Sequence, residues 1–177
     1  MTERQKALNK LTDWMPNAVS SYQAVRNYDL SNKQTTSRIS HHMSSGLISE
    51  MDVIYCAKGY SIPFKNNKFI EEIFWRVYWR GWLESHPWIY DEYLDTIDNQ
   101  IISKKTGIKC FDNWKEELIN TGYLHNHSRM WFASIWIFTL GYSWQSGANF
   151  FKKNLLDFCP ASNTLGWRWV AGLQTIN

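Results

Sequence analysis

Apolar residues recur along this chain at the three- and four-residue spacing of α-helices, whereas the strict alternation of a half-buried strand is scarce. The clearest segment covers residues 68–84 and ends shortly before Pro87. Its apolar residues follow the i, i+3, i+4, i+7 spacing of one helix face: Ile70, Ile73, Phe74 and Val77. This spacing predicts an amphipathic helix with one apolar face.

Helix-start and helix-stop residues predict further helices in the rest of the chain. Ser49 and Asp52 form a capping-box pattern that Gly59 closes, and residues 1–12 predict another helix. Three more helices are expected to begin at a capping residue: Asp112, running to Gly122; Asn126, running to about Gly141; and Ser146, reaching about Leu156. Two segments are expected to be loops, namely residues 28–36 and 61–67. The pattern predicts an all-α fold, a compact multi-helix domain covering residues 1–177.

The composition is that of a globular protein, because 44% of the residues are hydrophobic and 20% are charged. Lys and Arg total 19 against 16 Asp and Glu, so the net charge of +3 permits contact with a polyanion without demanding it. The content of 11 Trp, 9 Tyr and 9 Phe is unusual. Such residues suit stacking on a planar ligand or base, electron transfer, or bulky packing, and composition does not choose among these.

Cysteine spacing and hydropathy favour a cytoplasmic protein without a membrane span or a metal site. The three cysteines lie far apart, with no CxxC pair, and fit neither a disulfide framework nor a zinc or iron–sulfur site. The first residues contain no apolar signal-peptide core. Residues 131–151 carry no charge, but their strongly apolar part, residues 130–140, is too short to cross a bilayer. No histidine has metal-ligand spacing.

Two polar clusters lie in the first half of the chain. Residues 36–40, Thr-Ser-Arg-Ile-Ser, place hydroxyls and a guanidinium in a loop that enters a helix, where backbone N–H groups favour phosphate oxygens. An ordinary polar loop is the alternative. Glu72, Trp75, Arg76 and Trp79 form a helical stripe that can hydrogen-bond the edge of a heterocycle and stack on its face. An amphipathic helix with an internal ion pair has the same pattern.

Two further clusters lie toward the C-terminus. Residues 121–130 place Asn126 and Arg129 at the entry to an apolar helix, where buried polar groups need hydrogen-bond partners, and Asp157 is the obvious one. A structural ion pair with no ligand is the alternative. Residues 157–169 are the most specific stretch, because an asparagine and two indoles flank a glycine where a loop leads into a helix.

Together, the four clusters resemble the FAD-binding domain of the DNA photolyase/cryptochrome family. The motifs TSRIS, EEIFWR, KTG…TGYLHNHSRM and ASNTLGWRW occur in the family's order, and the match runs from about Tyr22 to Trp169. One such motif is weak evidence, whereas four in this order are specific. The resemblance implies an all-helical domain that holds FAD beside a pocket for a damaged DNA base pair.

The resemblance also implies which residues would surround the cofactor. The residues that would hold the FAD phosphates and ribose are Tyr22, Thr36, Ser37, Arg38 and Ser40. Those that would lie against the flavin are Phe69, Arg76, Arg129 and Asp157, the last two as a salt bridge. Asn163 would sit near flavin N5 and stabilise its reduced state. Trp167 would be the indole nearest the flavin and Trp144 the second residue of an electron relay to the surface.

On the lesion side, Glu72, Trp75 and Trp169 would face a flipped-out pyrimidine dimer, with Asn126 and Met130 between it and the flavin. Light-excited reduced flavin would give the dimer an electron, the ring would split, and the electron would return. Such a site must be dry and rigid, which aromatic walls provide. The other aromatic residues at helical spacing, Tyr55, Trp114, Trp131 and Trp136, are assigned to the core.

The resemblance is incomplete in four respects. The family's N-terminal antenna domain is not found, so no second chromophore is expected. The chain ends at Asn177, where relatives continue, so a homodimer partner or another chain is a candidate to complete the pocket. Cys159 replaces the second acid of an Asp-x-Asp pair. The segment between Trp79 and Lys105 is shorter than usual, which leaves Trp88 or Tyr90 as the outer relay residue.

Three functions stay open. The lesion-side residues favour a photolyase-like enzyme acting on single- or double-stranded damaged DNA, with a modest basic patch to contact it: Arg38, Arg76, Arg80, Lys152, Lys153 and Arg168. A cryptochrome-like blue-light photoreceptor or redox module would bind FAD without repair. A binding protein of the same fold would have lost the flavin.

Overall fold

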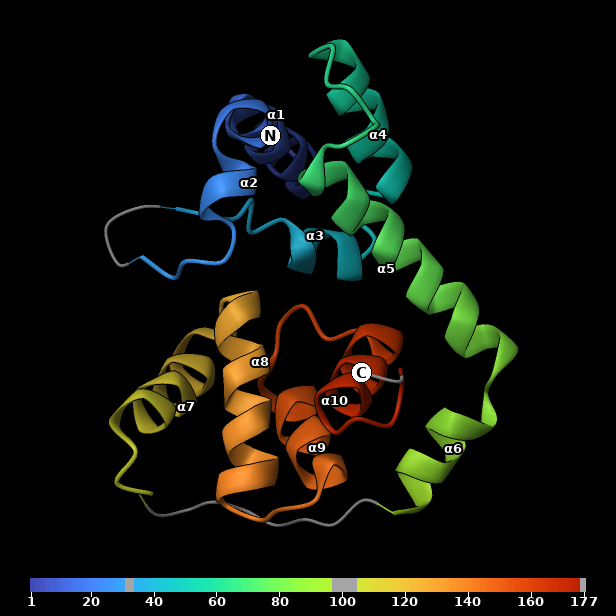
Figure 1. Cartoon of the computed structure of the whole chain (residues 1–177). Coiled ribbons are helices and arrows are strands. Elements are labelled where there is room, and N and C mark those ends of the chain that lie inside the picture. Colours follow the sequence, from blue (N-terminus) through green and yellow to red (C-terminus); the bar gives the residue numbers. More distant parts are fainter. Residues whose placement is uncertain (31–33, 97–104, 176–177) are drawn as a thin grey trace. The chain divides into compact units, whose positions relative to one another are not determined.

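The computed structural model describes residues 1–30, 34–96 and 105–175, and every regular element in these ranges is helical (Figure 1). The all-α class is therefore confirmed. The chain divides into two compact units, residues 1–78 and 79–177. The single-domain organisation expected from the sequence stays a prediction. None of the described helices combines the length and the hydropathy that a membrane crossing requires.

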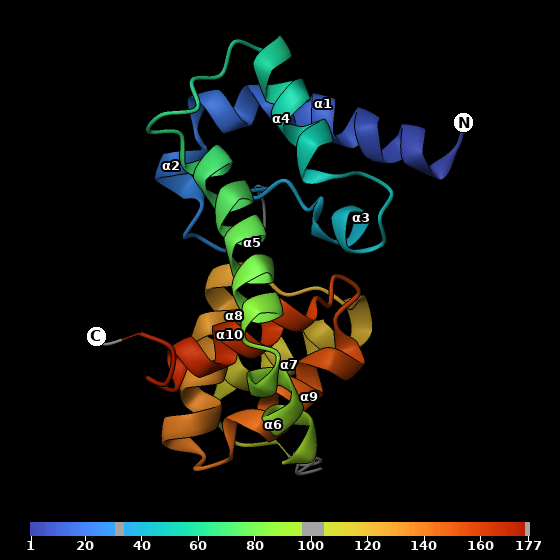
Figure 2. The same ribbon diagram turned by 90° about the vertical axis from the view of Figure 1, so that its right-hand side faces the viewer.

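The first unit contains four helices and the beginning of a fifth: α1 (Glu3–Ser20), α2 (Tyr22–Val25), α3 (Ser40–Ser44), α4 (Glu50–Gly59) and α5 (Lys68–Ser85). Helix α1 packs against α2 and α4 (Figure 2). The capping box of α4 is formed as predicted, because the Ser49 hydroxyl accepts from the Asp52 N–H and the Asp52 carboxylate accepts from the Ser49 N–H. Helix α1 runs well past residue 12 because Met15 and Ala18 continue its buried face.

The core of the first unit joins α1, α4 and the first turns of α5. Leu11, Val53 and Ile70 are among its fully buried side chains. The predicted apolar face of α5 is only half right, since Ile70 and Ile73 are buried whereas Phe74 and Val77 are 52% and 50% exposed. Along α5, the core of the first unit ends at Ile73, so Phe74 and Val77 do not pack into it.

The second unit contains the end of α5 and six further helical segments: α6 (Trp88–Asp95), α7 (Lys109–Thr121), α8 (Asn126–Ser134), the π-helix η1 (Ile135–Thr139), α9 (Trp144–Asn154) and α10 (Pro160–Val170). Helix α8 continues into η1 and contacts both α7 and α10, while α9 packs against α10 and η1 (Figure 1). This group of helices positions the cavity described below.

Three predicted helix starts in this unit are displaced. Asp112 lies inside α7 and does not cap it; its carboxylate accepts from the N–H groups of Thr106 and Gly107, which lowers the pKa of Asp112. Helix α8 is capped by His125 instead of Asn126, and α9 by Ser143 instead of Ser146. A polar residue in the first turn resembles a cap in sequence, and tertiary contacts decide where the helix begins.

Aromatic rings fill the core of the second unit. Phe111 and Phe132 stack with ring centroids 4.3 Å apart, and Trp136 lies 5.8 Å from Phe132. All three side chains are fully buried. The burial expected for Trp136 is therefore confirmed, and part of the unusual aromatic content is accounted for by packing. The core assignments of Tyr55 and Trp131 are wrong, because these side chains are 65% and 56% exposed.

Tyr93 gives a test of this core. Its side chain is fully buried, its hydroxyl has no hydrogen-bond partner in the described part of the chain, and burial, with Tyr90 adding to it, raises the pKa of Tyr93 to about 12. We expect Tyr93→Phe to raise the free energy of unfolding by about 1 kcal/mol at neutral pH, because it removes an unsatisfied polar group.

The pH dependence should change as well. The folded pKa of Tyr93, about 12, exceeds the value of about 10 for unfolded tyrosine. Its contribution to stability is therefore fully present below about pH 10 and is lost as the pH rises toward 12. Urea unfolding across this range should show a shallower loss for Tyr93→Phe than for the wild type. The exposed Tyr55 supplies the control variant Tyr55→Phe. If the free energy of unfolding depended on pH equally in the wild type and in both variants, the raised pKa of Tyr93 would be contradicted.

Candidate functional site

A cavity of about 120 Å³ opens in the second unit where α8, α9, α10 and the segment before α10 meet. Its lining contains most of the residues that the two C-terminal motifs predict: Asn126, Arg129, Met130, Asp157, Asn163 and Trp167. The volume corresponds to a few water molecules, which is less than a drug-sized ligand needs. Within this unit alone, the cavity can hold the edge of a planar ligand.

Arg129 is held in a fixed position at this cavity. Its Nη2 lies 2.9 Å from Asp157 Oδ2, its Nε donates to the Leu124 carbonyl at 2.7 Å, and its guanidinium lies over the Tyr123 ring. The Asp157 side chain is only 6% exposed. The predicted salt bridge is therefore present, and its place beside a flavin stays a prediction. A buried pair held in this way positions charge at the cavity wall.

Asn163 presents an acceptor with no partner. Its Nδ2 donates to the Ala148 carbonyl at 2.9 Å, and its buried Oδ1 has no hydrogen-bond partner in the described residues. Because a carbonyl oxygen only accepts, the amide nitrogen must face Ala148, which fixes the direction of Oδ1. Buried polar atoms are nearly always hydrogen-bonded. The site therefore fits a ligand that brings an N–H donor to Asn163.

Gly147 allows the close approach of Trp167 to α9. A Cβ atom placed on Gly147 would overlap the six-membered ring of the Trp167 indole. Trp167 is 2% exposed, and its ring contacts Phe151 and Trp136 edge to face, with centroids 5.1 Å and 6.1 Å away. Sequence reasoning missed this role of Gly147, because a glycine inside a helix carries no signal of what packs on it.

Trp144 and Trp169 stand at the outer side of the same unit. The Trp144 ring stacks on Tyr93 at 5.6 Å and lies 5.8 Å from the Arg168 guanidinium. It is not in ring contact with Trp167, whose ring neighbours in the described residues are Trp136 and Phe151. Trp169 is 39% exposed. The relay role of Trp144 and the lesion contact of Trp169 stay predictions.

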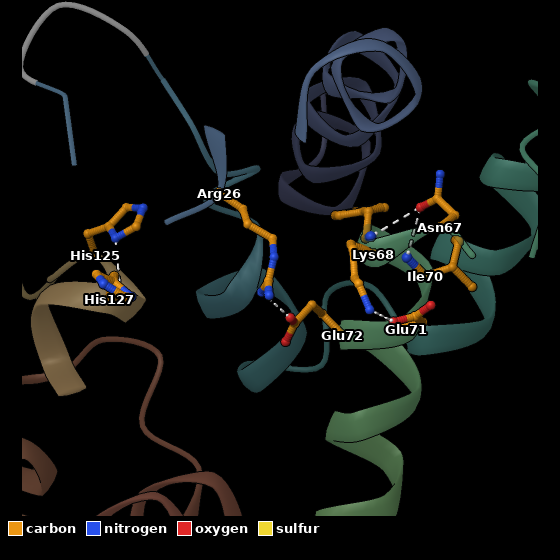
Figure 3. A network of polar contacts seen from close by, with 9 residues as sticks. Arg26, Asn67, Lys68, Ile70, Glu71, Glu72, His125 and His127 are labelled. Atoms are coloured by element: carbon orange, nitrogen blue, oxygen red, sulfur yellow. Dashed lines mark hydrogen bonds and ion pairs between the residues drawn. The ribbon is translucent and has the colours of Figure 1, made fainter. Parts of the chain in front are cut away.

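In the first unit, Glu72 and Arg76 each bind a residue from another element. Arg26 Nη1 lies 2.5 Å from Glu72 Oε1 (Figure 3), and Arg76 Nε lies 3.0 Å from Glu50 Oε1. The internal ion pair considered for these two α5 residues is therefore wrong. The role of Arg26 was missed, although it stands one helical turn after Tyr22 and was a visible basic neighbour of that predicted site residue.

Tyr22, Phe69 and Trp75 take different surroundings. The Tyr22 and Phe69 rings meet edge to face at 5.5 Å, both pack against Trp14, and Phe69 is 3% exposed. Trp75 is half exposed and contacts Tyr78 edge to face. Phe69 thus belongs to the core of its unit, whereas Trp75 offers an indole face for stacking. Their roles toward a cofactor or a lesion stay predictions.

The predicted phosphate-binding loop, residues 36–40, has an unusual backbone. Arg38 has a φ of 51°, a left-handed conformation that non-glycine residues rarely adopt and that is often kept for function. Helix α3, which begins at Ser40, has only five residues, so its dipole contributes little. Burial and the charge of Arg38 lower the pKa of Lys10. A second cationic side chain therefore lies near this loop. Binding of phosphate by this loop stays a prediction.

Cys159 lines the cavity as a buried thiol. It lies two residues after Asp157, so the cavity wall has one carboxylate there and not two. Among the described residues, no group of three or more His, Cys, Asp or Glu side chains could hold a metal ion.

The comparison with known families decides what this chain is related to. The family model of the FAD-binding domain of DNA photolyase matches residues 69–177, which is more than half of the chain. The chain belongs to this family. The matched range contains the whole lining of the cavity, including the Arg129–Asp157 pair, Asn163 and Trp167.

Individual relatives agree with this assignment. The deoxyribodipyrimidine photo-lyase of Agrobacterium fabrum is 32% identical over 94% of this chain and 37% of that protein. Cryptochrome DASH of Danio rerio is 26% identical over 90% of this chain and 34% of that protein. The crystal structure of a bacterial class III photolyase from Agrobacterium tumefaciens superimposes with a TM-score of 0.72 at 30% identity, covering 96% of this chain and 38% of that one. The photolyase-type domain thus spans well under half the length of these relatives.

Gly147→Ala tests the packing that shapes the site. The added methyl group must displace Trp167, so we expect the free energy of unfolding to fall by about 1–3 kcal/mol and the near-ultraviolet circular dichroism of the indoles to change. Gly166→Ala is the matched control, because a methyl group there would meet no other side chain or backbone atom within 4 Å. That variant should gain about 0.5–1 kcal/mol of helix stability. Equal effects of the two variants would refute the role of Gly147.

Proposed function

We propose that this chain forms the FAD-binding part of a light-driven enzyme that repairs cyclobutane pyrimidine dimers in DNA. The observation that carries the proposal is the cavity in which a fixed Arg129, the unpartnered oxygen of Asn163 and the buried indole of Trp167 come together. Membership of the photolyase family and a curated relative named deoxyribodipyrimidine photo-lyase support it.

The residues at the cavity suit a flavin edge. Reduced flavin carries an N–H at its central ring, which is the donor that Asn163 Oδ1 lacks, whereas the oxidised ring offers only an acceptor there. Asn163 therefore favours the reduced cofactor. Arg129, kept in place by Asp157 and the Leu124 carbonyl, supplies positive charge that stabilises an anionic ring. Trp167 and Phe151 wall the cavity with apolar rings and exclude water.

When bound, photoexcited reduced FAD would supply the electron that opens the cyclobutane ring and would take it back afterwards. The protein's own contribution is to position and to shield. Met130 lines the cavity beside Arg129, and Asn126 lies at its exposed rim. These two side chains are placed to separate cofactor from lesion, as the family resemblance implies. Trp75 and Trp169, both part-exposed indoles, would stack on the extruded bases.

FAD phosphates and ribose are assigned to Tyr22, Thr36, Ser37, Arg38 and Ser40. The left-handed backbone at Arg38 and the presence of two cationic side chains, Arg38 and Lys10, near the loop support an anion there. Damaged DNA, single- or double-stranded, is the proposed substrate, and the modest net charge of +3 predicts affinity that falls as salt rises. A second copy or another chain that completes the FAD pocket is also proposed.

The test is anaerobic illumination of the FAD-loaded, reduced protein with an oligonucleotide that contains one thymine dimer. We expect dimers to disappear in the light and to persist in the dark, followed as recovery of thymine absorbance. Glu72→Ala should lower the repair rate by roughly tenfold, because a hydrogen bond to the pyrimidine edge is lost. Glu71→Ala is the matched control on the same helix, since that carboxylate pairs with Lys68 (Figure 3). Absence of light-dependent loss of dimers would refute repair.

A second function, a cryptochrome-like photosensor, is favoured by one observation. The Glu72 carboxylate, the group expected to read the lesion, is already paired with Arg26 at 2.5 Å. A relative named cryptochrome DASH shares the domain. In this function, the chain would bind FAD and respond to light without repairing DNA.

Two measurements separate the functions. The repair enzyme and the photosensor are both expected to show reduction of bound FAD by blue light, at a rate that Trp167→Phe lowers by roughly tenfold or more. Only the repair enzyme is expected to bind dimer-containing DNA more tightly than undamaged DNA of the same sequence, measured by fluorescence anisotropy at several salt concentrations. A protein that stays colourless after FAD is added would refute both functions and favour a binding protein that has lost the flavin.

A further inference from the structure

We infer that Lys10 and His42 extend the phosphate-binding part of the FAD site, and that His42 takes up a proton when FAD binds. This inference rests on the proposed flavin function and extends it. The family resemblance assigns the FAD phosphates and ribose to Tyr22 and to the loop 36–40, and neither Lys10 nor His42 belongs to that set.

Helices α1 and α3 of the first unit (Figure 2) bring these two side chains together. Leu11 of α1 and Met43 of α3 are buried in the same hydrophobic core. Lys10 and His42 directly precede them along the chain and are only part-buried. The two side chains are close enough for the charge of Lys10 to act on the His42 ring. Two basic groups from separate helices therefore meet at the edge of this core.

A groove of about 750 Å³ lies on α1 beside the loop 36–40. Lys10 lines this groove, and so does Gln34, whose Nε2 donates to the Thr36 carbonyl at 2.9 Å. The groove therefore adjoins the loop to which the FAD phosphates are assigned. Its volume falls in the range of ligand pockets. A phosphate group bound at the loop can thus extend into the groove and reach the Lys10 ammonium.

Lys10 has room for an anionic partner. Its ammonium makes no hydrogen bond or ion pair with the described residues, whereas Lys6, one turn earlier on α1, binds Glu3 at 2.7 Å. Burial, and then the charge of Arg38, lower the pKa of Lys10. Asp13 is the acid of the described groove lining, and it is exposed, so water screens its attraction. A phosphate oxygen would supply the counter-charge and accept a charge-assisted hydrogen bond from Lys10.

The surroundings of His42 favour its neutral form as long as no anion is bound. Its ring lies against the His41 ring with centroids 3.6 Å apart, and its buried Nδ1 has no hydrogen-bond partner among the described residues. Burial and the charges of His41 and Lys10 lower the pKa of His42, and Glu3, which raises it, is already paired with Lys6. A bound phosphate would reverse this balance, because a nearby negative charge favours the imidazolium, in which both ring nitrogens are donors.

The proton that His42 takes up comes from the solvent. Both phosphates of FAD keep their negative charges between about pH 6 and pH 8, so the cofactor itself takes up no proton in this range. The FAD-bound chain then holds more protons than the FAD-free chain. Lowering the pH therefore favours the bound form, and the dissociation constant of FAD should fall as the pH falls from about 8 to about 6.

The first test titrates the whole chain with oxidised FAD in the dark and follows flavin fluorescence. We expect Lys10→Met to raise the dissociation constant by roughly tenfold, because a charge-assisted hydrogen bond is lost. Lys10→Arg keeps the charge and should stay within about threefold of the wild type. Lys58→Met is the matched control, because it also removes one positive charge but from the exposed last turn of α4. It should change the constant by less than about twofold.

The second test counts protons. Calorimetric titration with FAD at about pH 6.5, in two buffers that differ in ionisation enthalpy, gives the number of protons taken up per FAD bound. We expect on the order of half a proton for the wild type and none for His42→Gln, which stays polar and cannot titrate. A merely structural His42 would leave the proton count unchanged. His86→Gln, which removes an imidazole of the second unit, is the control and should retain the uptake.

The outcomes separate the inference from the proposed function. If the chain binds no FAD, both are overturned. If FAD binds, but Lys10→Met and Lys58→Met weaken binding equally, or the uptake of protons survives in His42→Gln, the inference alone is overturned. The wild type gives a test that needs no variant to fold: its dissociation constant should fall by about threefold or more between pH 8 and pH 6, and a constant that does not change with pH overturns the inference as well.

Discussion

The contact between α9 and α10 is the constraint on which the site depends. Gly147 lets the Trp167 indole lie directly on the backbone of α9, and Asn163, one turn earlier on α10, donates to the Ala148 carbonyl of the same helix. These contacts fix both the depth and the rotation of α10. The fixed rotation directs the unpartnered oxygen of Asn163 and sets the plane of the indole. A larger residue at position 147 would change all of these at once, since close-packed interiors do not absorb added atoms without displacement.

The polar groups of the second unit are arranged around that contact. Asp157 neutralises Arg129 at the cavity wall, and the Leu124 carbonyl takes a further guanidinium hydrogen. Such pairing is what makes a buried charge tolerable, and the net contribution of the pair to stability is small compared with the cost of breaking it. Asn163 Oδ1 is one of several buried polar atoms of this unit with no hydrogen-bond partner in the described residues, Thr164 Oγ1 and Trp167 Nε1 among them, and it belongs to a residue that lines the cavity. In an interior where most polar groups are paired, it indicates a donor supplied by a ligand, and a reduced flavin is such a donor.

Aromatic residues of this domain pack its core, and some of them are also proposed to act on the cofactor or the lesion. The sequence could not separate the two uses, because an indole at helical spacing has the same pattern whether it fills a core or carries an electron. Trp136 is fully buried, and its ring contacts with Trp167 and Tyr142 show that it fills the core of the second unit. Trp144, which the resemblance assigns to the relay, stacks on Tyr93 and lies beside the Arg168 guanidinium, and its relay role stays a prediction.

The sequence by itself determined the helical class and the capping box at Ser49, since these follow from local periodicity and local hydrogen bonding. The ordered motifs also identified several of the residues that line the cavity, Arg129, Asp157 and Asn163 among them. Only the tertiary structure decided where α7, α8 and α9 begin, that Glu72 pairs with Arg26, and that Gly147 holds Trp167. Where a helix starts depends on which of several candidate residues the surrounding fold places to accept hydrogen bonds from the first backbone N–H groups. Ion pairs and ring contacts depend on distances between residues far apart in the chain, and spacing along the chain does not encode such distances.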